Sequence, residues 1–276
     1  MKQKVVCVNG KFVDAKKTGL IVPFDPGFLY GYGVFETMRS YEGKIFRFAD
    51  HINRLKDASR RLGIKVAYSR EQLERFSERL LKHNKLSNAY LRLNVWKGVD
   101  GSQLLIFAKR LPAYPKDIYR RGFKAVVSEY VYNERSATAG IKSLSYLPFY
   151  VARQRAEALG YNETILLNTR GDVCEGSRSN IFLLQRNTLL TPSLQSGCLP
   201  GITRKVVIQL AKKNTIRVRE TKLAPRELYR SAEVFATNSL IEIMPVTAIN
   251  KGKINRGKPG PITQHLLHQY RTLTKR

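Results

Sequence analysis

Cysteine is scarce in this chain of 276 residues, which holds three, Cys7, Cys174 and Cys198. An odd number of widely spaced cysteines indicates neither a disulfide framework nor a cysteine-based zinc site. The four histidines form no metal-ligand pattern either, because only His265 and His268 are close in sequence and no third ligand stands near them. We therefore expect no bound metal, and we expect a protein of a reducing cytoplasm.

Long apolar segments are also missing. No run approaches the roughly 18 apolar residues of a membrane-spanning helix, and the N-terminal sequence Met-Lys-Gln-Lys lacks the apolar core of a secretion signal. With 43% hydrophobic and 25% charged residues, the composition is typical of a globular protein and excludes a disordered chain or a fibre. These features favour a soluble cytoplasmic protein without a membrane partner.

Acidic residues are few as well. Lysine and arginine number 49 against 21 aspartates and glutamates, which leaves a formal net charge of +28. Such a balance first suggests a nucleic-acid partner. The cations are spread along the whole chain, however, and no zinc-finger spacing, RNP-like segment or Gly-Arg tract accompanies them. We therefore expect no nucleic-acid partner, and we attribute the charge mainly to solubility and the host environment.

The length suits one large domain or two small ones, at about 150 residues each. Pro112 and Pro115 lie close together in Arg-Leu-Pro-Ala-Tyr-Pro, and prolines so placed are typical of a linker. We predict a small α/β domain over residues 1–112, a linker over 113–119 and a larger domain over 120–276.

Local patterns predict a mixed α/β fold. The turn Asn9-Gly10 predicts a hairpin of strands 4–8 and 11–13, and Ser69 with Gln72 forms the capping box of a helix. In the second half, strand-like runs outnumber helices without regular alternation, which favours an antiparallel-rich sheet or barrel. The other predicted strands are 89–96, 123–129, 164–168, 180–184, 188–191, 216–222, 233–237 and 243–249, and the other predicted helices are 50–63, about 145–159, 202–213, 225–230 and 261–272.

Four segments carry residues that suit cofactor chemistry, although each alone also fits an ordinary turn or helix start. Leu199-Pro-Gly-Ile-Thr203 opens a predicted helix, where free N–H groups and a hydroxyl bind phosphate. Residues 235–239, Phe-Ala-Thr-Asn-Ser, end a strand with small polar side chains. Lys142 stands at the head of a predicted helix, an unfavourable place for a cation, and Glu175 lies at a predicted strand end. A lysine, a carboxylate and a phosphate cup are together the parts of pyridoxal 5′-phosphate chemistry.

Six motifs resemble those of the class IV aminotransferases in their residues and in their order along the chain. This family is the fold-type IV group of branched-chain aminotransferases, D-amino-acid aminotransferases and aminodeoxychorismate lyases. The resemblance runs through nearly the whole chain and implies a two-domain mixed α/β fold with pyridoxal phosphate as cofactor. The motifs are Phe28-Leu-Tyr-Gly-Tyr-Gly-Val-Phe-Glu-Thr-Met-Arg39, Asp50-His-Ile-Asn-Arg54-Leu, Ile141-Lys-Ser-Leu-Ser-Tyr-Leu-Pro148, Glu175-Gly-Ser-Arg-Ser-Asn-Ile-Phe182, Leu199-Pro-Gly-Ile-Thr-Arg204 and Phe235-Ala-Thr-Asn-Ser-Leu-Ile-Glu-Ile-Met-Pro245.

By this resemblance, Lys142 forms the Schiff base with the cofactor and later shuttles the α-proton of the substrate. Glu175 holds the pyridine nitrogen protonated, which makes the ring an electron sink. Arg54 grips the phosphate, since its forked guanidinium suits an oxyanion. The other implied cofactor ligands are Ile202, Thr203, Asn238 and Ser239.

The resemblance also implies a substrate pocket. Four residues match positions that line it in the family: Tyr30, Phe35, Tyr90 and Arg92. Tyr90 and Arg92 share one strand face, which places Arg92 well for a substrate carboxylate. Arg178 stands where small or acidic residues are more usual, and it either recognises an extra carboxylate or faces solvent.

The branch of the family is less determined. Residues 98–104 lack the Arg-x-His trap of typical D-amino-acid enzymes, and Thr37 stands where branched-chain enzymes often have glycine. The motif Phe-Glu-Thr-Met-Arg looks more like that of the lyase branch. We expect an aminotransferase that moves an amino group between an amino acid and a 2-oxo acid. The alternative is a lyase that forms 4-aminobenzoate and pyruvate from aminodeoxychorismate, and the remote alternative is a nucleic-acid-binding protein on a degenerate enzyme scaffold.

The family forms dimers, and the resemblance therefore implies a homodimer. Two subunits of charge +28 repel each other. We expect an interface that is apolar at its centre, with dimerisation strengthened by salt.

Overall fold

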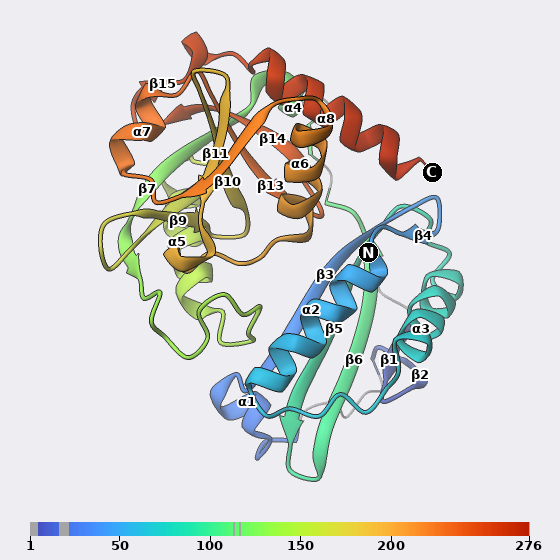
Figure 1. The fold of residues 1–276 in the computed structure, drawn as a ribbon. Coiled ribbons are helices and arrows are strands. Elements are labelled where there is room, and N and C mark those ends of the chain that lie inside the picture. The colour runs from blue at the N-terminus through green and yellow to red at the C-terminus, as the bar shows by residue number, and fades with distance from the viewer. Residues whose placement is uncertain (1–4, 17–21, 113, 116, 276) are drawn as a thin grey trace. The chain divides into compact units, whose positions relative to one another are not determined.

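The computed structural model describes residues 5–16, 22–112, 114–115 and 117–275 (Figure 1). The described chain forms two compact units. The first unit holds residues 1–113 together with Ile141–Tyr146, and the second holds Tyr114–Gly140 and Leu147–Arg276. The linker over 113–119 stays a prediction, and its residues 113 and 116 lie outside the described part of the chain.

The first unit is built on an antiparallel sheet with the strand order β2-β1-β6-β5-β3-β4. Asn9 and Gly10 both have positive φ and close the tight turn of the β1–β2 hairpin, as their sequence predicts. Residue 4 of the predicted first strand lies outside the described residues. The strands are β1 Val5–Val8, β2 Lys11–Asp14, β3 Gly33–Tyr41, β4 Lys44–Ile45, β5 Ala89–Gly98 and β6 Gly101–Arg110.

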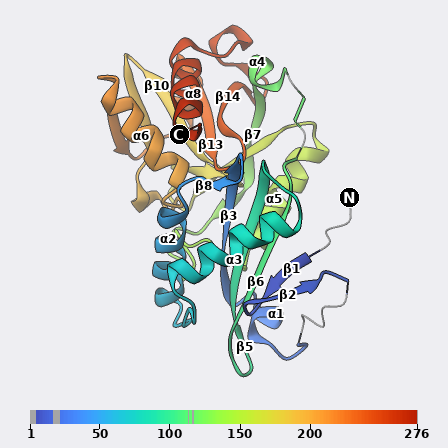
Figure 2. The same cartoon turned by 90° about the vertical axis from the view of Figure 1, so that its right-hand side faces the viewer.

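Two helices cover one face of this sheet. Figure 2 shows α2 and α3 along the same side of the strands, and their apolar side chains share one core with Leu91, Leu93 and Val95 of β5. Ser69 and Gln72 form the predicted capping box of α3. Because strand side chains alternate, the opposite face of the sheet carries Phe35, Tyr90 and Arg92. The helices are α1 Pro26–Tyr30, α2 Phe48–Arg61 and α3 Arg70–His83.

The second unit contains a mixed sheet in the order β12-β11-β10-β13-β14-β7-β8-β9, with β15 beside β14. β9 is last in this order but also contacts β10 and β11, so the sheet curls back on itself. This is the antiparallel-rich, barrel-like arrangement predicted from the sequence. The strands are β7 Phe123–Tyr132, β8 Glu163–Asn168, β9 Val173–Gly176, β10 Asn180–Gln185, β11 Thr188–Pro192, β12 Arg217–Thr221, β13 Glu233–Asn238, β14 Glu242–Ile249 and β15 Gly252–Lys253.

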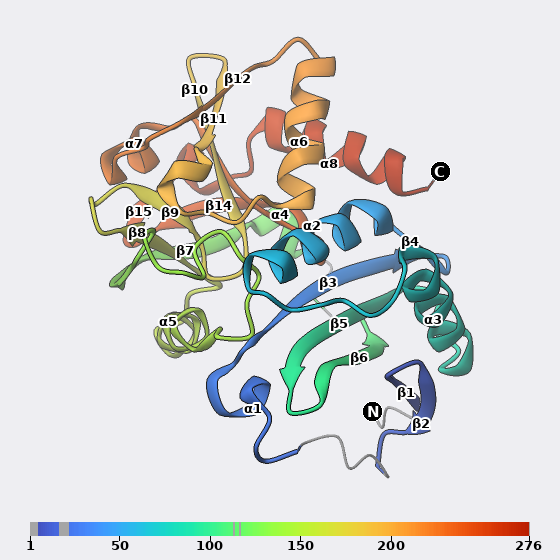
Figure 3. The same ribbon diagram turned by 60° about the horizontal axis from the view of Figure 1, so that its bottom comes forward.

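Helices pack on this second sheet. α6 and α8 contact each other and strands β13 and β14, whereas α5 lies apart from them against β7 and β8 (Figure 3). Among the described residues, no helix combines the length and apolar character needed to cross a bilayer. The helices are α4 Ile118–Arg121, α5 Leu147–Ala158, α6 Ile202–Lys213, α7 Pro225–Arg230 and α8 Pro261–Thr274, with short 3-10 turns η1 Leu194–Ser196 and η2 Asn255–Gly257.

The placement of Lys142 at the head of a helix was wrong. Its segment runs beside β3: Phe35 N–H donates to the Lys142 carbonyl at 2.8 Å, and Leu144 N–H donates to the Gly33 carbonyl at 2.8 Å. The helix begins later, at Leu147, because Pro148 is tolerated only in a first helical turn. Ile141–Tyr146 thus joins the first unit through main-chain hydrogen bonds.

Candidate functional site

The first unit gathers two cations around one aromatic ring. Lys142 Nζ lies 4.6 Å from the ring centroid of Phe35, and Arg92 Cζ lies 3.6 Å from the same centroid. Phe35 is 3% exposed, and the ring of Tyr146 meets it edge-on at 5.5 Å. The guanidinium of Arg92 also donates from Nε to Asn94 Oδ1 at 2.8 Å, which fixes its direction. An amine and a guanidinium therefore lie beside one aromatic ring.

Two further predicted residues of the first unit lie at different places. Tyr90 stacks on Phe107 with ring centroids 5.9 Å apart, on the sheet face that also carries Arg92. Tyr30 ends α1, and its side chain is 73% exposed. Its carbonyl accepts a hydrogen bond from Ser145 Oγ at 3.1 Å, which ties α1 to the segment of Lys142.

Arg54 is held by a buried carboxylate on the helix-covered face of the sheet. It donates to Glu36 from Nε at 2.7 Å and from Nη2 at 2.6 Å, and His51 Nδ1 lies 2.7 Å from Glu36 Oε2. Burial alone raises the pKa of Glu36, but the charges and hydrogen bonds of Arg54 and His51 outweigh it and lower this pKa to about 2. Burial lowers the pKa of His51, and the charge and hydrogen bond of Glu36 offset this only in part. The buried carboxylate of Glu36 is therefore held by a guanidinium and an imidazole together.

Glu175 of the second unit is tied to the loop before α6. It stands near the end of β9, as predicted, and is 7% exposed. Its Oε2 accepts the N–H of Leu199 at 3.0 Å, and the Leu199 carbonyl accepts from Asn180 Nδ2 at 2.8 Å. One peptide segment is thus held by side chains from both ends of the β9–β10 turn.

The start of α6 offers main-chain donors. Gly201 is the N-cap and has no side chain with which to cap the helix, so the first N–H groups at Ile202 and Thr203 lack a side-chain partner at the cap. The Thr203 side chain is buried in this first turn. A Cβ on Gly201 would lie 2.0 Å from Asn180 Oδ1, so only glycine fits there. Such a helix start binds an anion such as a phosphate.

Asn238 connects the end of β13 to the same region. Its Nδ2 donates to the Arg178 carbonyl at 2.9 Å, and its Oδ1 accepts from Leu240 N–H and Ile241 N–H in the turn that holds Ser239. The Arg178 side chain turns back within the second unit, with Nη2 donating to the Asn162 carbonyl at 3.2 Å.

Sequence reasoning missed three residues that shape these groups: Glu36, His51 and Glu163. A signal for Glu36 was present, because it alternates with Val34 and Met38, whose side chains face the core. Across the described residues, no group of three or more histidine, cysteine, aspartate or glutamate side chains has the arrangement of a metal site.

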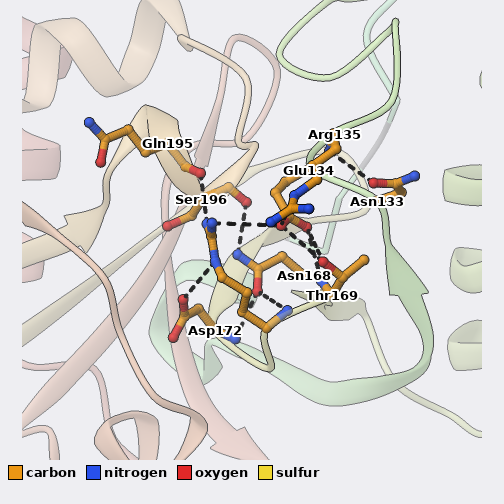
Figure 4. A network of polar contacts seen from close by, with 9 residues as sticks. Asn133, Glu134, Arg135, Asn168, Thr169, Asp172, Gln195 and Ser196 are labelled. Carbon is orange, nitrogen blue, oxygen red and sulfur yellow. Dashed lines mark hydrogen bonds and ion pairs between the residues drawn. The ribbon is translucent and has the colours of Figure 1, made fainter.

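A separate polar network fixes the loop after β7 (Figure 4). Glu134 accepts from the N–H of Thr169 at 3.0 Å and from its hydroxyl at 2.9 Å, and the first of these bonds lowers the pKa of Glu134. Asn168 Nδ2 donates to the Ser196 carbonyl at 3.3 Å. The loop after β7, the β8–β9 turn and η1 are thereby joined by hydrogen bonds.

The chain is similar to the proteins of one known family. The family model described as amino-transferase class IV matches residues 33–249. A protein of Methanocaldococcus jannaschii provisionally named as a branched-chain-amino-acid aminotransferase is 36% identical over 97% of this chain and 96% of its own. D-alanine aminotransferase of Listeria monocytogenes is 33% identical over 96% and 94%, and aminodeoxychorismate lyase of Bacillus subtilis is 32% identical over 90% and 87%.

Solved structures are similar over almost the whole chain. The branched-chain amino acid aminotransferase of Escherichia coli superposes with a TM-score of 0.93 at 28% identity, covering 99% of this chain and 95% of that one. A second branched-chain amino acid aminotransferase, solved with pyridoxamine 5′-phosphate, gives the same TM-score at 26% identity and the same coverage.

Proposed function

This chain belongs to the class IV aminotransferases, a family of pyridoxal phosphate enzymes, and we propose that it moves an amino group between an apolar amino acid and a 2-oxo acid. The observation that carries the proposal is the ring of Phe35 with Lys142 and Arg92 beside it. An amino acid presents a carboxylate and an α-proton to the same surface. Arg92 suits the carboxylate, and Lys142 suits the proton.

The residues present fit pyridoxal phosphate. In the second unit, the N–H groups of Ile202 and Thr203 at a helix start suit the phosphate, and the buried carboxylate of Glu175 suits a protonated pyridine nitrogen. We assign Asn238 and Ser239 to the same phosphate. In the first unit, we assign Arg54 to the phosphate as well, with its guanidinium held in place by Glu36 through Nε and Nη2.

The chemistry divides between the cofactor and the chain. When bound, the cofactor supplies an aldehyde for amines and a ring that accepts electrons. Lys142 holds the cofactor and then takes and returns the α-proton with its amine. Arg92 orients the substrate through its carboxylate, and Glu175 keeps a proton on the pyridine nitrogen. Phe35 and Tyr146 keep water from the face where Lys142 acts.

Aromatic surroundings favour an apolar substrate side chain. Phe107 pairs directly with Arg92 across the strands β5 and β6, and Tyr90 stacks on Phe107. The hydrocarbon side chain of a branched-chain amino acid gains from contact with such rings. The Arg178 guanidinium donates to the Asn162 carbonyl, and we assign it no substrate contact.

A second copy of the chain is the proposed partner. In the first unit, Phe24, Phe28 and Tyr30 around α1 are 76%, 60% and 73% exposed. In the second unit, α5 buries two alanines and leaves Leu147 and Tyr150 exposed. Apolar patches of this kind are typical of subunit interfaces. Sedimentation analysis tests the proposal: we expect a homodimer whose dissociation constant falls as salt is raised, and a dimer weakened by moderate salt would contradict it.

The decisive experiment follows the visible absorption of the purified protein with added pyridoxal phosphate. We expect a cofactor band that is lost in Lys142→Ala, and we expect branched-chain amino acids to bleach it while a 2-oxo acid restores it. No band under any condition would refute the cofactor assignment. A band that no amino acid bleaches, together with 4-aminobenzoate formed from aminodeoxychorismate, would favour the lyase.

A further inference from the structure

The side chain of Glu163, the first residue of β8, is fully buried and yet well supplied with donors. Its Oε1 accepts from Thr164 N–H at 3.0 Å, from Ser177 N–H at 3.1 Å and from Ser177 Oγ at 2.5 Å. Its Oε2 accepts from Ser179 Oγ at 2.8 Å. A buried carboxylate lowers the stability of the fold unless its oxygens are hydrogen-bonded. These hydrogen bonds therefore stabilise Glu163 in its buried position.

Most of these donors belong to the turn 176–179 between β9 and β10. Within the turn, Gly176 N–H donates to the Ser179 carbonyl at 2.6 Å. A Cβ on Gly176 would lie 2.3 Å from Ser179 Oγ and 3.1 Å from Glu163 Cδ. The main chain is therefore folded closely onto the carboxylate, and the Ser177 N–H is shared between Glu163 and the Thr164 carbonyl, which accepts it at 3.0 Å.

Glu175 and Asn180 flank this turn on its two sides. Both side chains bind the main chain of Leu199: Glu175 accepts its N–H, and Asn180 donates to its carbonyl. Leu199 leads through Gly201 to the start of α6. A continuous set of contacts thus runs from Glu163 through the turn to both sides of the Leu199 residue.

We propose that Glu163 is a positioning residue that sets the turn 176–179 and, through it, the placement of Glu175 relative to segment 199–203. It contacts neither the cofactor nor the substrate in this scheme and acts through Ser177 and Ser179. The inference rests on the proposed function only in treating Glu175 and segment 199–203 as cofactor ligands. Arg178 adds a charge contribution, because its Nε lies 3.9 Å from Glu163 Oε2.

The first test needs no cofactor. Amide hydrogen exchange at residue resolution is compared between the parent protein, Glu163→Gln and Glu163→Ala. We expect the Leu199 N–H to exchange about tenfold faster in Glu163→Ala, because a lost charged acceptor loosens the turn and the bond to Glu175, with a smaller effect in Glu163→Gln. The matched control is Glu233→Ala, which removes another buried carboxylate that accepts two N–H groups and a hydroxyl, at the start of α8.

The second test measures the affinity of the cofactor-free protein for pyridoxal phosphate. We expect the dissociation constant to rise about tenfold in Glu163→Ala and about threefold in Glu163→Gln, whereas Glu233→Ala lowers the melting temperature without changing this constant. Unchanged Leu199 exchange in a folded Glu163→Ala would overturn the inference whether or not the parent protein binds cofactor.

The serine variants provide the test if Glu163→Ala does not fold. Ser177→Ala and Ser179→Ala each remove one hydroxyl donor, and we expect each to speed Leu199 exchange by a smaller factor. If neither does, Glu163 is only structural and the inference fails. If the parent protein binds no pyridoxal phosphate while the exchange results hold, the proposed function fails and the positioning role stands.

Discussion

Two buried glutamates, Glu36 in the first unit and Glu233 in the second, have different kinds of partner. Glu36 is bound by a guanidinium and an imidazole. Glu233 is bound by main-chain N–H groups and a hydroxyl. A charged partner cannot be replaced by water without cost when it is buried, whereas neutral donors form part of the local fold. Glu36 is therefore the more sensitive of the two to loss of a charged partner.

The largest expected effect concerns Lys142. We expect Lys142→Ala to lower the turnover number by about three to four orders of magnitude, since a positioned proton-transfer group contributes about this much, while the melting temperature changes little. Lys109→Ala is the matched control, because Lys109 Nζ also lies over an aromatic ring, 4.9 Å from the centroid of Tyr90. Steady-state transamination assays and thermal unfolding of both variants measure this, and equal losses of activity would contradict the role of Lys142.

The comparison of the carboxylates is tested by paired substitutions. We expect Glu36→Gln to lower the free energy of unfolding by about 3–5 kcal/mol, because Arg54 is left without its buried counter-charge. Glu233→Gln is expected to cost only about 1–2 kcal/mol, since its partners are neutral donors. Urea unfolding of the two variants measures these changes in the free energy of unfolding. Equal costs would show that the kind of partner does not matter here.

A smaller effect is expected at the start of α6. Gly201→Ala places a methyl group against Asn180 and should cost about 1–3 kcal/mol of stability, as overpacking does. It should also weaken the binding of pyridoxal phosphate more than that of pyridoxal, because the phosphate is the group that the helix start binds. The control is Gly252→Ala, where the new Cβ meets its nearest neighbour at an ordinary 3.4 Å.

The smallest expected effect is a dependence of stability on pH. Burial lowers the pKa of His51 in the folded protein, so below its unfolded pKa, about 6.5, the unfolded chain binds a proton that the folded chain does not. Stability is thus present above that pH and is lost as the pH falls. A second loss follows as the pH drops from about 4 toward 2 and Glu36 becomes protonated. His51→Gln should remove the first step and keep the second in unfolding curves at graded pH, and a first step that persists would assign it elsewhere.

Much of the local structure followed from neighbouring residues. The helices at 202–213 and 225–230 and the capping box at Ser69 form as predicted, because caps, prolines and apolar spacing act over a few positions. Glu175 also stands at a strand end, as its surroundings indicate.

The errors and omissions concern distant contacts. Lys142 was placed at a helix start, whereas its segment runs beside β3, more than a hundred residues earlier in the chain. Pairing of this kind depends on which backbone groups remain free after the rest of the sheet forms, and no local pattern records that. The same holds for Glu163, whose serine donors come from a turn beyond the next strand.

The sequence by itself determined many of the helices and strands, the family and the residue types that suit the cofactor, because these depend on local propensity and on motifs in a given order. Only the tertiary structure decided which partners each of these residues contacts. It paired Arg54 with Glu36, set Lys142 and Arg92 at one ring, and folded the turn beside Glu175 onto Glu163. Buried charges must find partners within the packed chain, and those partners are brought together only when distant segments meet.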